Sequence, residues 1–127
     1  MNKLDYSKIT PEQRLAIDEV MDEFNFEKVE RHMKAVNWGW SAPTPEDEWN
    51  LEIPDLSTIK AACRRLLVNA FTAVSMVKEN DSDYKGPCYS SCGGLTVYAW
   101  PDNRCQVFFA VTDWWYEPDD FKPNDYE

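Results

Sequence analysis

Residues 56–78 are the segment of this chain that most constrains its fold. Apolar side chains recur there at helical spacing and form one wide face: Leu56, Ile59, Cys63, Leu66, Leu67, Ala70, Phe71, Val74 and Val77. Asp55 stands just before this run and suits the N-cap position. The spacing therefore predicts a long helix that starts after Asp55, ends near residues 78–80 and occupies the centre of the fold.

Two shorter helices are predicted before it. Thr10, Pro11 and Gln13 form a helix start, because Thr can cap, Pro suits the first turn and Gln can complete a capping box. The first helix then carries a buried stripe (Ile17, Val20, Met21, Phe24) and an acidic outer surface (Asp18, Glu19, Asp22, Glu23). A second helix is expected after Asn25, with Phe26, Val29, Met33 and Val36 on one face and an end near residues 37–39.

A β-hairpin is predicted near the C-terminal end. Residues 95–100 and 105–111 alternate in polarity, and Pro101-Asp-Asn-Arg104 between them is typical turn sequence. Two strands alone are marginally stable, so 88–91 or 113–116 could add a strand. We therefore expect one α+β domain over residues 1–127: three helices followed by an antiparallel β-hairpin or small sheet packed on the long third helix. Residues 1–9 and 117–127 are expected to be terminal arms, and 41–48 an exposed connection.

Charge is segregated along the chain. Residues 1–55 and 79–127 each carry a net charge of −7, whereas residues 56–78 carry +4, within an overall −10. Such a surface repels nucleic acid phosphates and favours a basic partner. No apolar run is long enough to span a membrane, and no apolar signal region follows Met1, so we expect a cytoplasmic protein with reduced thiols.

Catalytic and metal signatures are incomplete. His32 is the only imidazole, and no Ser or Cys motif places a base beside a nucleophile, so we expect neither an enzyme nor a cofactor. Cys88, Cys92 and Cys105 could bind zinc with His32 or an Asp, or form a disulfide. Ordinary free thiols near a hairpin base are the simpler interpretation.

Short motifs along residues 26–116 give this chain a resemblance to a diffuse group of small phage and prophage proteins. They are Asn37-Trp-Gly-Trp40, Ile53-Pro-Asp-Leu56, Ala61-Ala-Cys-Arg-Arg-Leu-Leu67, Gly93-Gly94 and Val111-Thr-Asp-Trp114. The resemblance implies a context only: an accessory protein of a mobile element, acting in the bacterial host cytoplasm. The acidic first helix, the 43–48 loop and the acidic tail depart from the group's pattern.

Two functional hypotheses follow. The first is a non-catalytic acidic binding protein, such as an inhibitor or anti-defence factor, that engages a basic, nucleic-acid-binding host protein through Asp18, Glu19, Asp22, Glu23, Glu46, Asp47 and Glu48. The alternative is a pocket that sequesters a nucleotide or cyclic nucleotide through Trp38, Trp40, Lys60, Arg64, Tyr98 and Trp100. Lys60 and Arg64 could instead pair with acids of the first helix. A homodimer across an unpaired strand edge is also possible.

Overall fold

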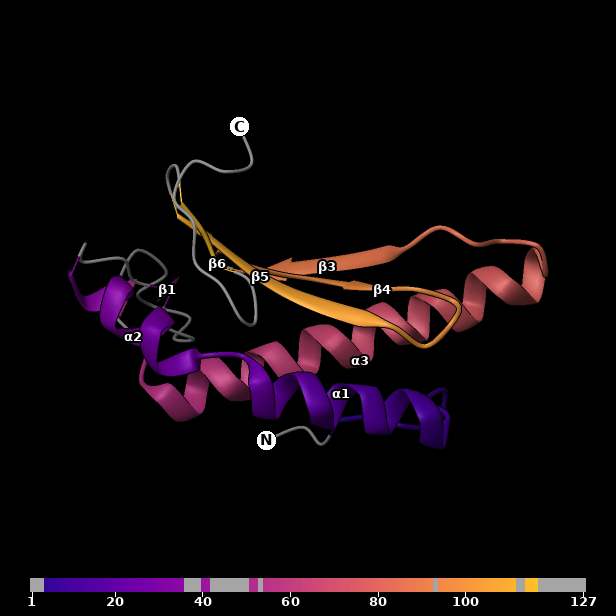
Figure 1. Ribbon diagram of the computed structural model, residues 1–127, viewed down its shortest axis with the longest axis horizontal. Coiled ribbons are helices and arrows are strands. Elements are labelled where there is room, and N and C mark those ends of the chain that lie inside the picture. The colour runs from indigo at the N-terminus through magenta and orange to yellow at the C-terminus, as the bar shows by residue number, and fades with distance from the viewer. Residues whose placement is uncertain are drawn as a thin grey trace.

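The computed structural model confirms the α+β class (Figure 1). It describes residues 4–35, 40–41, 51–52, 54–92, 94–111 and 114–116. Three helices are followed by an antiparallel sheet, and the long third helix lies along that sheet (Figure 1). The helices are α1 (Pro11–Glu23), α2 (Phe26–Ala35) and α3 (Leu56–Asn80).

Local capping sets the helix starts. The Thr10 hydroxyl accepts a hydrogen bond from the backbone N–H of Gln13, and the Gln13 side-chain oxygen accepts one from the backbone N–H of Thr10. These two bonds complete the capping box of α1. The Asp55 carboxylate caps α3 by accepting hydrogen bonds from the Thr58 amide at 2.9 Å and the Ser57 hydroxyl at 3.1 Å. Both starts agree with the sequence prediction.

The main sheet has four antiparallel strands in the order β3-β4-β5-β6. Their bounds are Cys88–Cys92, Leu95–Ala99, Cys105–Val111 and Trp114–Tyr116. Both segments considered as additional strands therefore flank the hairpin. The β4–β5 turn closes through hydrogen bonds between Trp100 and Arg104 and from the Asn103 amide to Trp100, with Asn103 at φ 70.

A second, two-stranded sheet was not predicted. It pairs β1 (Trp40–Ser41) with β2 (Leu51–Glu52) at the ends of the expected connection. Strands of two residues carry no recognisable periodicity, so the sequence offers no pattern for them. The residues between them, 42–50, lie outside the described part.

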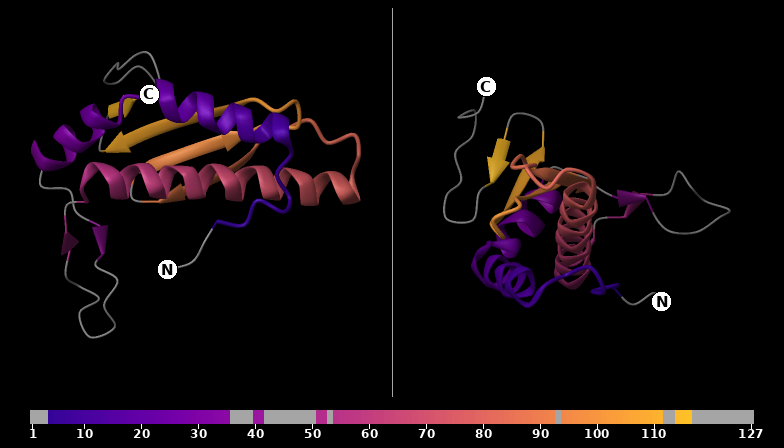
Figure 2. Two further views of the ribbon diagram at one scale, coloured as in Figure 1. Left: turned by 90° about the horizontal axis from the view of Figure 1, so that it is seen from below. Right: turned by 90° about the vertical axis from the view of Figure 1, so that its right-hand side faces the viewer.

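The core lies between one face of the main sheet and the helices. Helix α3 runs under β3 and β4, and α1 lies beside it under β5 (Figure 2). Alternate sheet residues face this layer and are buried, as are the apolar stripes of all three helices: Leu95, Val97, Ala99, Val107 and Phe109 from the sheet, and Ile17, Met33, Ile59, Leu67 and Phe71 from the helices.

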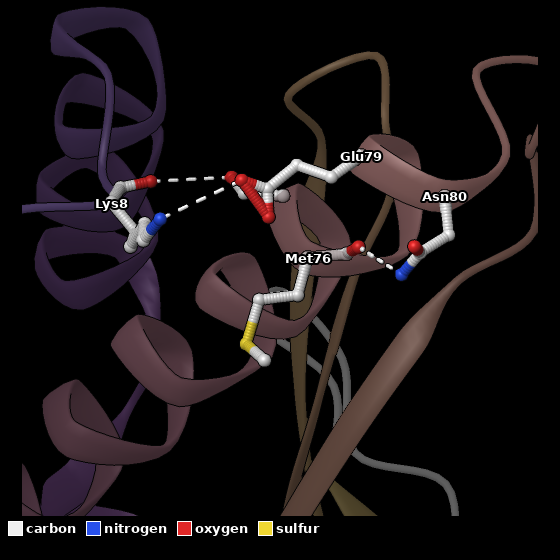
Figure 3. Close-up of polar contacts among 5 residues, drawn as sticks. Lys8, Met76, Glu79 and Asn80 are labelled. Carbon is white, nitrogen blue, oxygen red and sulfur yellow. Dashed lines mark hydrogen bonds and ion pairs between the residues drawn. The ribbon is translucent and has the colours of Figure 1, made fainter.

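The chain before α1 is held against this body. Leu4, Tyr6 and Ile9 pack on the core, although residues 1–9 were expected to be an arm. The Lys8 ammonium lies 3.6 Å from the Glu79 carboxylate at the end of α3, and the Lys8 carbonyl accepts a hydrogen bond from the Ser75 hydroxyl (Figure 3). Residues 117–127, the other expected arm, lie outside the described part.

Candidate functional site

The acidic surface of α1 is exposed over its second half. Glu19, Asp22 and Glu23 are exposed, and no ion pair among the described residues involves them. Asp18 differs, because its carboxylate lies 2.9 Å from the Arg64 guanidinium on α3. The ion pairing between the basic helix α3 and the acidic helix α1 that the sequence allowed thus occurs at Arg64. Glu46, Asp47 and Glu48 lie outside the described residues.

The positions of these carboxylates are electrostatically unfavourable for α1. The C-terminal end of a helix carries partial negative charge and is stabilised by basic side chains. Asp22 and Glu23 stand in the last turn of α1, which has no basic residue. Local helix stability therefore does not explain their presence.

A groove lies between this half of α1 and the β4–β5 turn. It has a volume of about 370 Å³, and Glu19 and Glu23, one helical turn apart, line it from the helix side. Trp100 and Arg104 line it from the turn. The Arg104 guanidinium lies 4.8 Å from the Trp100 ring centroid, and its Nε donates a hydrogen bond to Asp102 at 2.8 Å.

The polar chemistry of this groove suits a cation. Two carboxylates line it from α1, and negative charge attracts guanidinium and ammonium groups. The protein's own Arg104 lies over the Trp100 ring, with Asp102 as its carboxylate. A second guanidinium or a lysine ammonium in the groove would meet Glu19 and Glu23.

Cys105 lines the groove without being a reactive thiol. Its Sγ donates a weak hydrogen bond to the Ala16 carbonyl at 3.6 Å. Burial, with the negative charge of Glu19 as a further cause, raises the pKa of Cys105 to about 12. The thiol therefore stays protonated near neutral pH, which disfavours both nucleophilic attack and metal binding.

A second groove lies at the α1–α2 junction beside Lys60. It has a volume of about 750 Å³, and three carboxylates, those of Asp22, Glu23 and Glu27, line it together with Lys60. One ammonium among three carboxylates gives a net negative lining. A phosphate would be repelled here, so this groove does not favour the nucleotide alternative.

The residues of the nucleotide alternative are not brought together. Arg64 is bound to Asp18, and it also donates a hydrogen bond to the Tyr6 hydroxyl at 3.3 Å. Tyr98 lies on the sheet face opposite α3, in an aromatic cluster with Tyr89, Trp100 and Phe108. Lys60 and Arg64 are on the helical side. Trp38 and the Trp40 side chain lie outside the described part.

The cysteines of the zinc alternative are also separated. All four cysteines are free thiols. Cys88 and Cys105 both pair with Ala99 from opposite sides, so β4 lies between them, and Cys92 stands at the other end of β3. His32 is on α2, 6.1 Å from the Phe109 ring centroid, and burial lowers its pKa. Within the described residues, no group of three His, Cys, Asp or Glu side chains could hold a metal ion.

Sequence reasoning named Glu19, Glu23 and Trp100 but assigned them to different hypotheses. Their joint groove depends on α1 packing beside β5, and no local pattern encodes that packing. The nearest available signal was the four-residue spacing of the two glutamates.

No protein-family model, no curated protein sequence and no solved structure matches this chain. In the described part of the chain, none of the helices combines the length and apolar character that crossing a bilayer requires.

Proposed function

We propose that this chain is a non-catalytic binding protein that captures basic side chains of a partner protein on the acidic half of α1. The observation that carries the proposal is the groove that Glu19 and Glu23 line from α1 and the β4–β5 turn lines from the sheet. An arginine or lysine of the partner enters this groove, where the two carboxylates bind its charge.

The surrounding charge supports this function. Asp22 and Glu27 continue the negative surface from the first groove into the second, with Glu23 shared by both. A net charge of −10 raises the rate at which a basic partner associates. A basic nucleic-acid-binding host protein has such a surface, and the context of a phage accessory or anti-defence protein in a bacterial host fits that choice of partner.

The test uses a fluorescent arginine-rich peptide and its citrulline counterpart, which keeps the shape and lacks the charge. Binding is measured by fluorescence anisotropy at low and at moderate salt. We expect Glu19→Gln/Glu23→Gln to weaken binding of the arginine peptide and to flatten its salt dependence. The citrulline peptide is expected to bind poorly to every variant.

A matched control distinguishes the effect of the groove carboxylates on affinity from the effect of net charge. Asp81→Asn/Asp83→Asn removes two exposed carboxylates at the far end of α3 and changes the net charge equally. We expect this variant to lose much less affinity than the α1 variant. Equal losses in the two variants would contradict the proposal, because the peptide would then respond to total charge alone.

A further inference from the structure

Strand β5 is paired with its two neighbours over different parts of its length. On one side, β4 pairs with residues 105–109 of β5. On the other side, β6 pairs only with residues 109–111. Among the described residues, no strand therefore pairs with residues 105–108 on the side away from β4. This stretch contains neither a charged residue nor a proline, the features that usually protect an open sheet edge.

The hydrogen bonds of the β4–β5 turn show which backbone groups this open edge offers. The Trp100 N–H donates to the Arg104 carbonyl at 2.9 Å, so Arg104 directs its backbone groups toward β4. Successive residues of an antiparallel strand direct these groups to opposite sides. Cys105 and Val107 therefore direct their N–H and C=O groups away from β4. In the described part of the chain, no residue hydrogen-bonds with these four groups.

The open edge borders the groove of the proposed function. Cys105 and Gln106 line this groove together with Glu19 and Glu23 of α1, which lies under β5 (Figure 2). The side chain of Cys105 points toward α1, because its Sγ donates a hydrogen bond to the Ala16 carbonyl. Residues directly opposite each other in a ladder share one face of the sheet. A side chain opposite Cys105 on an added strand would thus lie beside the two carboxylates.

Given the proposed function, on which this inference rests, we propose that the basic partner binds as an extended segment that adds a strand to residues 105–108 of β5. The segment runs antiparallel to β5, like every pair of strands in the main sheet. Its backbone completes the hydrogen bonds of Cys105 and Val107. An arginine opposite Cys105 binds Glu19 and Glu23, because its guanidinium has five N–H donors for the carboxylate oxygens.

The neighbouring sequence of this chain does not suit the open edge. An antiparallel continuation of β6 would bring Pro118 opposite Val107 and Asp120 opposite Cys105. Pro118 has no N–H to donate to the edge, and Asp120 would be repelled by the carboxylates of α1. A second copy supplies no basic strand, because the four strands of the main sheet contain no Arg or Lys. The charge of the groove therefore favours a different, basic chain.

Amide hydrogen exchange, followed by nuclear magnetic resonance, tests the edge in the native chain. The Val107 side chain is buried, but its N–H points away from β4. We therefore expect this amide to exchange faster in the free chain than those of Gln106 and Phe108, which face β4. The arginine-rich peptide should slow exchange at Cys105 and Val107. A Val107 amide that is already protected without peptide would overturn the proposal, as would one that stays unprotected at saturation.

Backbone N-methylation provides a matched pair of peptides for fluorescence anisotropy. Each peptide has a single arginine within an alternating Thr and Val sequence. N-methylation of the arginine removes the N–H that faces β5, whereas N-methylation of the next residue removes an N–H that faces away from it. We expect the first change to weaken binding by at least about 10-fold and the second to have little effect.

The same titration with Glu19→Gln/Glu23→Gln distinguishes this inference from the proposed function. Both are supported if this variant binds the unmodified peptide weakly and only methylation of the arginine N–H lowers the affinity of the native chain. If the variant binds weakly but the two methylated peptides bind the native chain equally, strand pairing is overturned and the proposed function stands. If the variant binds as tightly as the native chain, the proposed function fails and this inference fails with it.

Discussion

Arg64 on α3 and Asp18 on α1 form an ion pair of 2.9 Å that joins the two long helices. It takes one basic residue away from the anion site considered from the sequence. It also divides the four acids between residues 18 and 23 of α1 into one that stabilises the fold and three that are exposed. Asp18 is the structural member, and Glu19, Asp22 and Glu23 are available to a partner.

This division gives different phenotypes for neighbouring acids. Asp18→Asn should lower the free energy of unfolding by less than about 1 kcal/mol, because the pair is only partly buried. It should leave arginine-peptide affinity close to that of the native chain. Urea unfolding and anisotropy measure the two effects, and a loss of affinity as large as that of Glu19→Gln/Glu23→Gln would contradict the assignment.

Arg104 adds a positive charge to the lining of the groove and is expected to oppose a basic side chain there. Arg104→Gln removes that charge and leaves Asp102 without its ion pair, so we expect the arginine peptide to bind about 2- to 5-fold more tightly. Arg65→Gln makes the same charge change at an exposed position of α3 and should have a smaller effect. Weaker binding by Arg104→Gln would show that Arg104 is part of the site.

The cysteines should differ in thiol reactivity according to their burial. Burial raises the pKa values of Cys63 and Cys105 to about 12, so at pH 8 only about one in ten thousand of either thiol is ionised. Cys92 is exposed and should react first with a thiol-specific reagent. Glu19→Gln should speed the reaction of Cys105, whose pKa that carboxylate helps to raise. Mass spectrometry after timed alkylation identifies each site.

The N-cap of α3, Asp55, should make the free energy of unfolding depend on pH in the acid range. Hydrogen bonds from Thr58 and Ser57 lower the pKa of Asp55 in the folded chain. Because the pKa of Asp55 is lower in the folded chain, the ionised carboxylate stabilises the fold. This stabilisation is complete above the pKa of the unfolded chain, about 3.9, and is lost as the pH falls through the pKa of the folded chain. Asp55→Asn keeps a capping side chain and should lose this part of the pH dependence. Thermal unfolding of both proteins between neutral and acid pH measures the difference.

The sequence predicted the elements whose residues repeat at a fixed spacing. Each of α1, α2 and α3 has an apolar stripe, and α1 and α3 also have a capping residue at the expected place. The β4–β5 hairpin followed from alternation and its turn residues. These features are local, so they can be recognised without knowing how the elements pack.

The candidate site could be predicted only in part. The exposed acids of α1 were identifiable because they lie off the apolar stripe. The groove was not, because Trp100 and Arg104 reach Glu19 and Glu23 only through the packing of α1 beside β5. The separation of Lys60 from Tyr98 likewise depends on which sheet face α3 covers.

The most direct test of basic side-chain capture is a nuclear magnetic resonance titration of the ¹⁵N-labelled chain with the arginine-rich peptide. The account predicts that the amides of Glu19 and Glu23 and the indole N–H of Trp100 shift together in saturable fashion, with little change from the citrulline peptide. Shifts that spread over the exposed acids at Asp81 and Asp83 while Trp100 stays unchanged would contradict it.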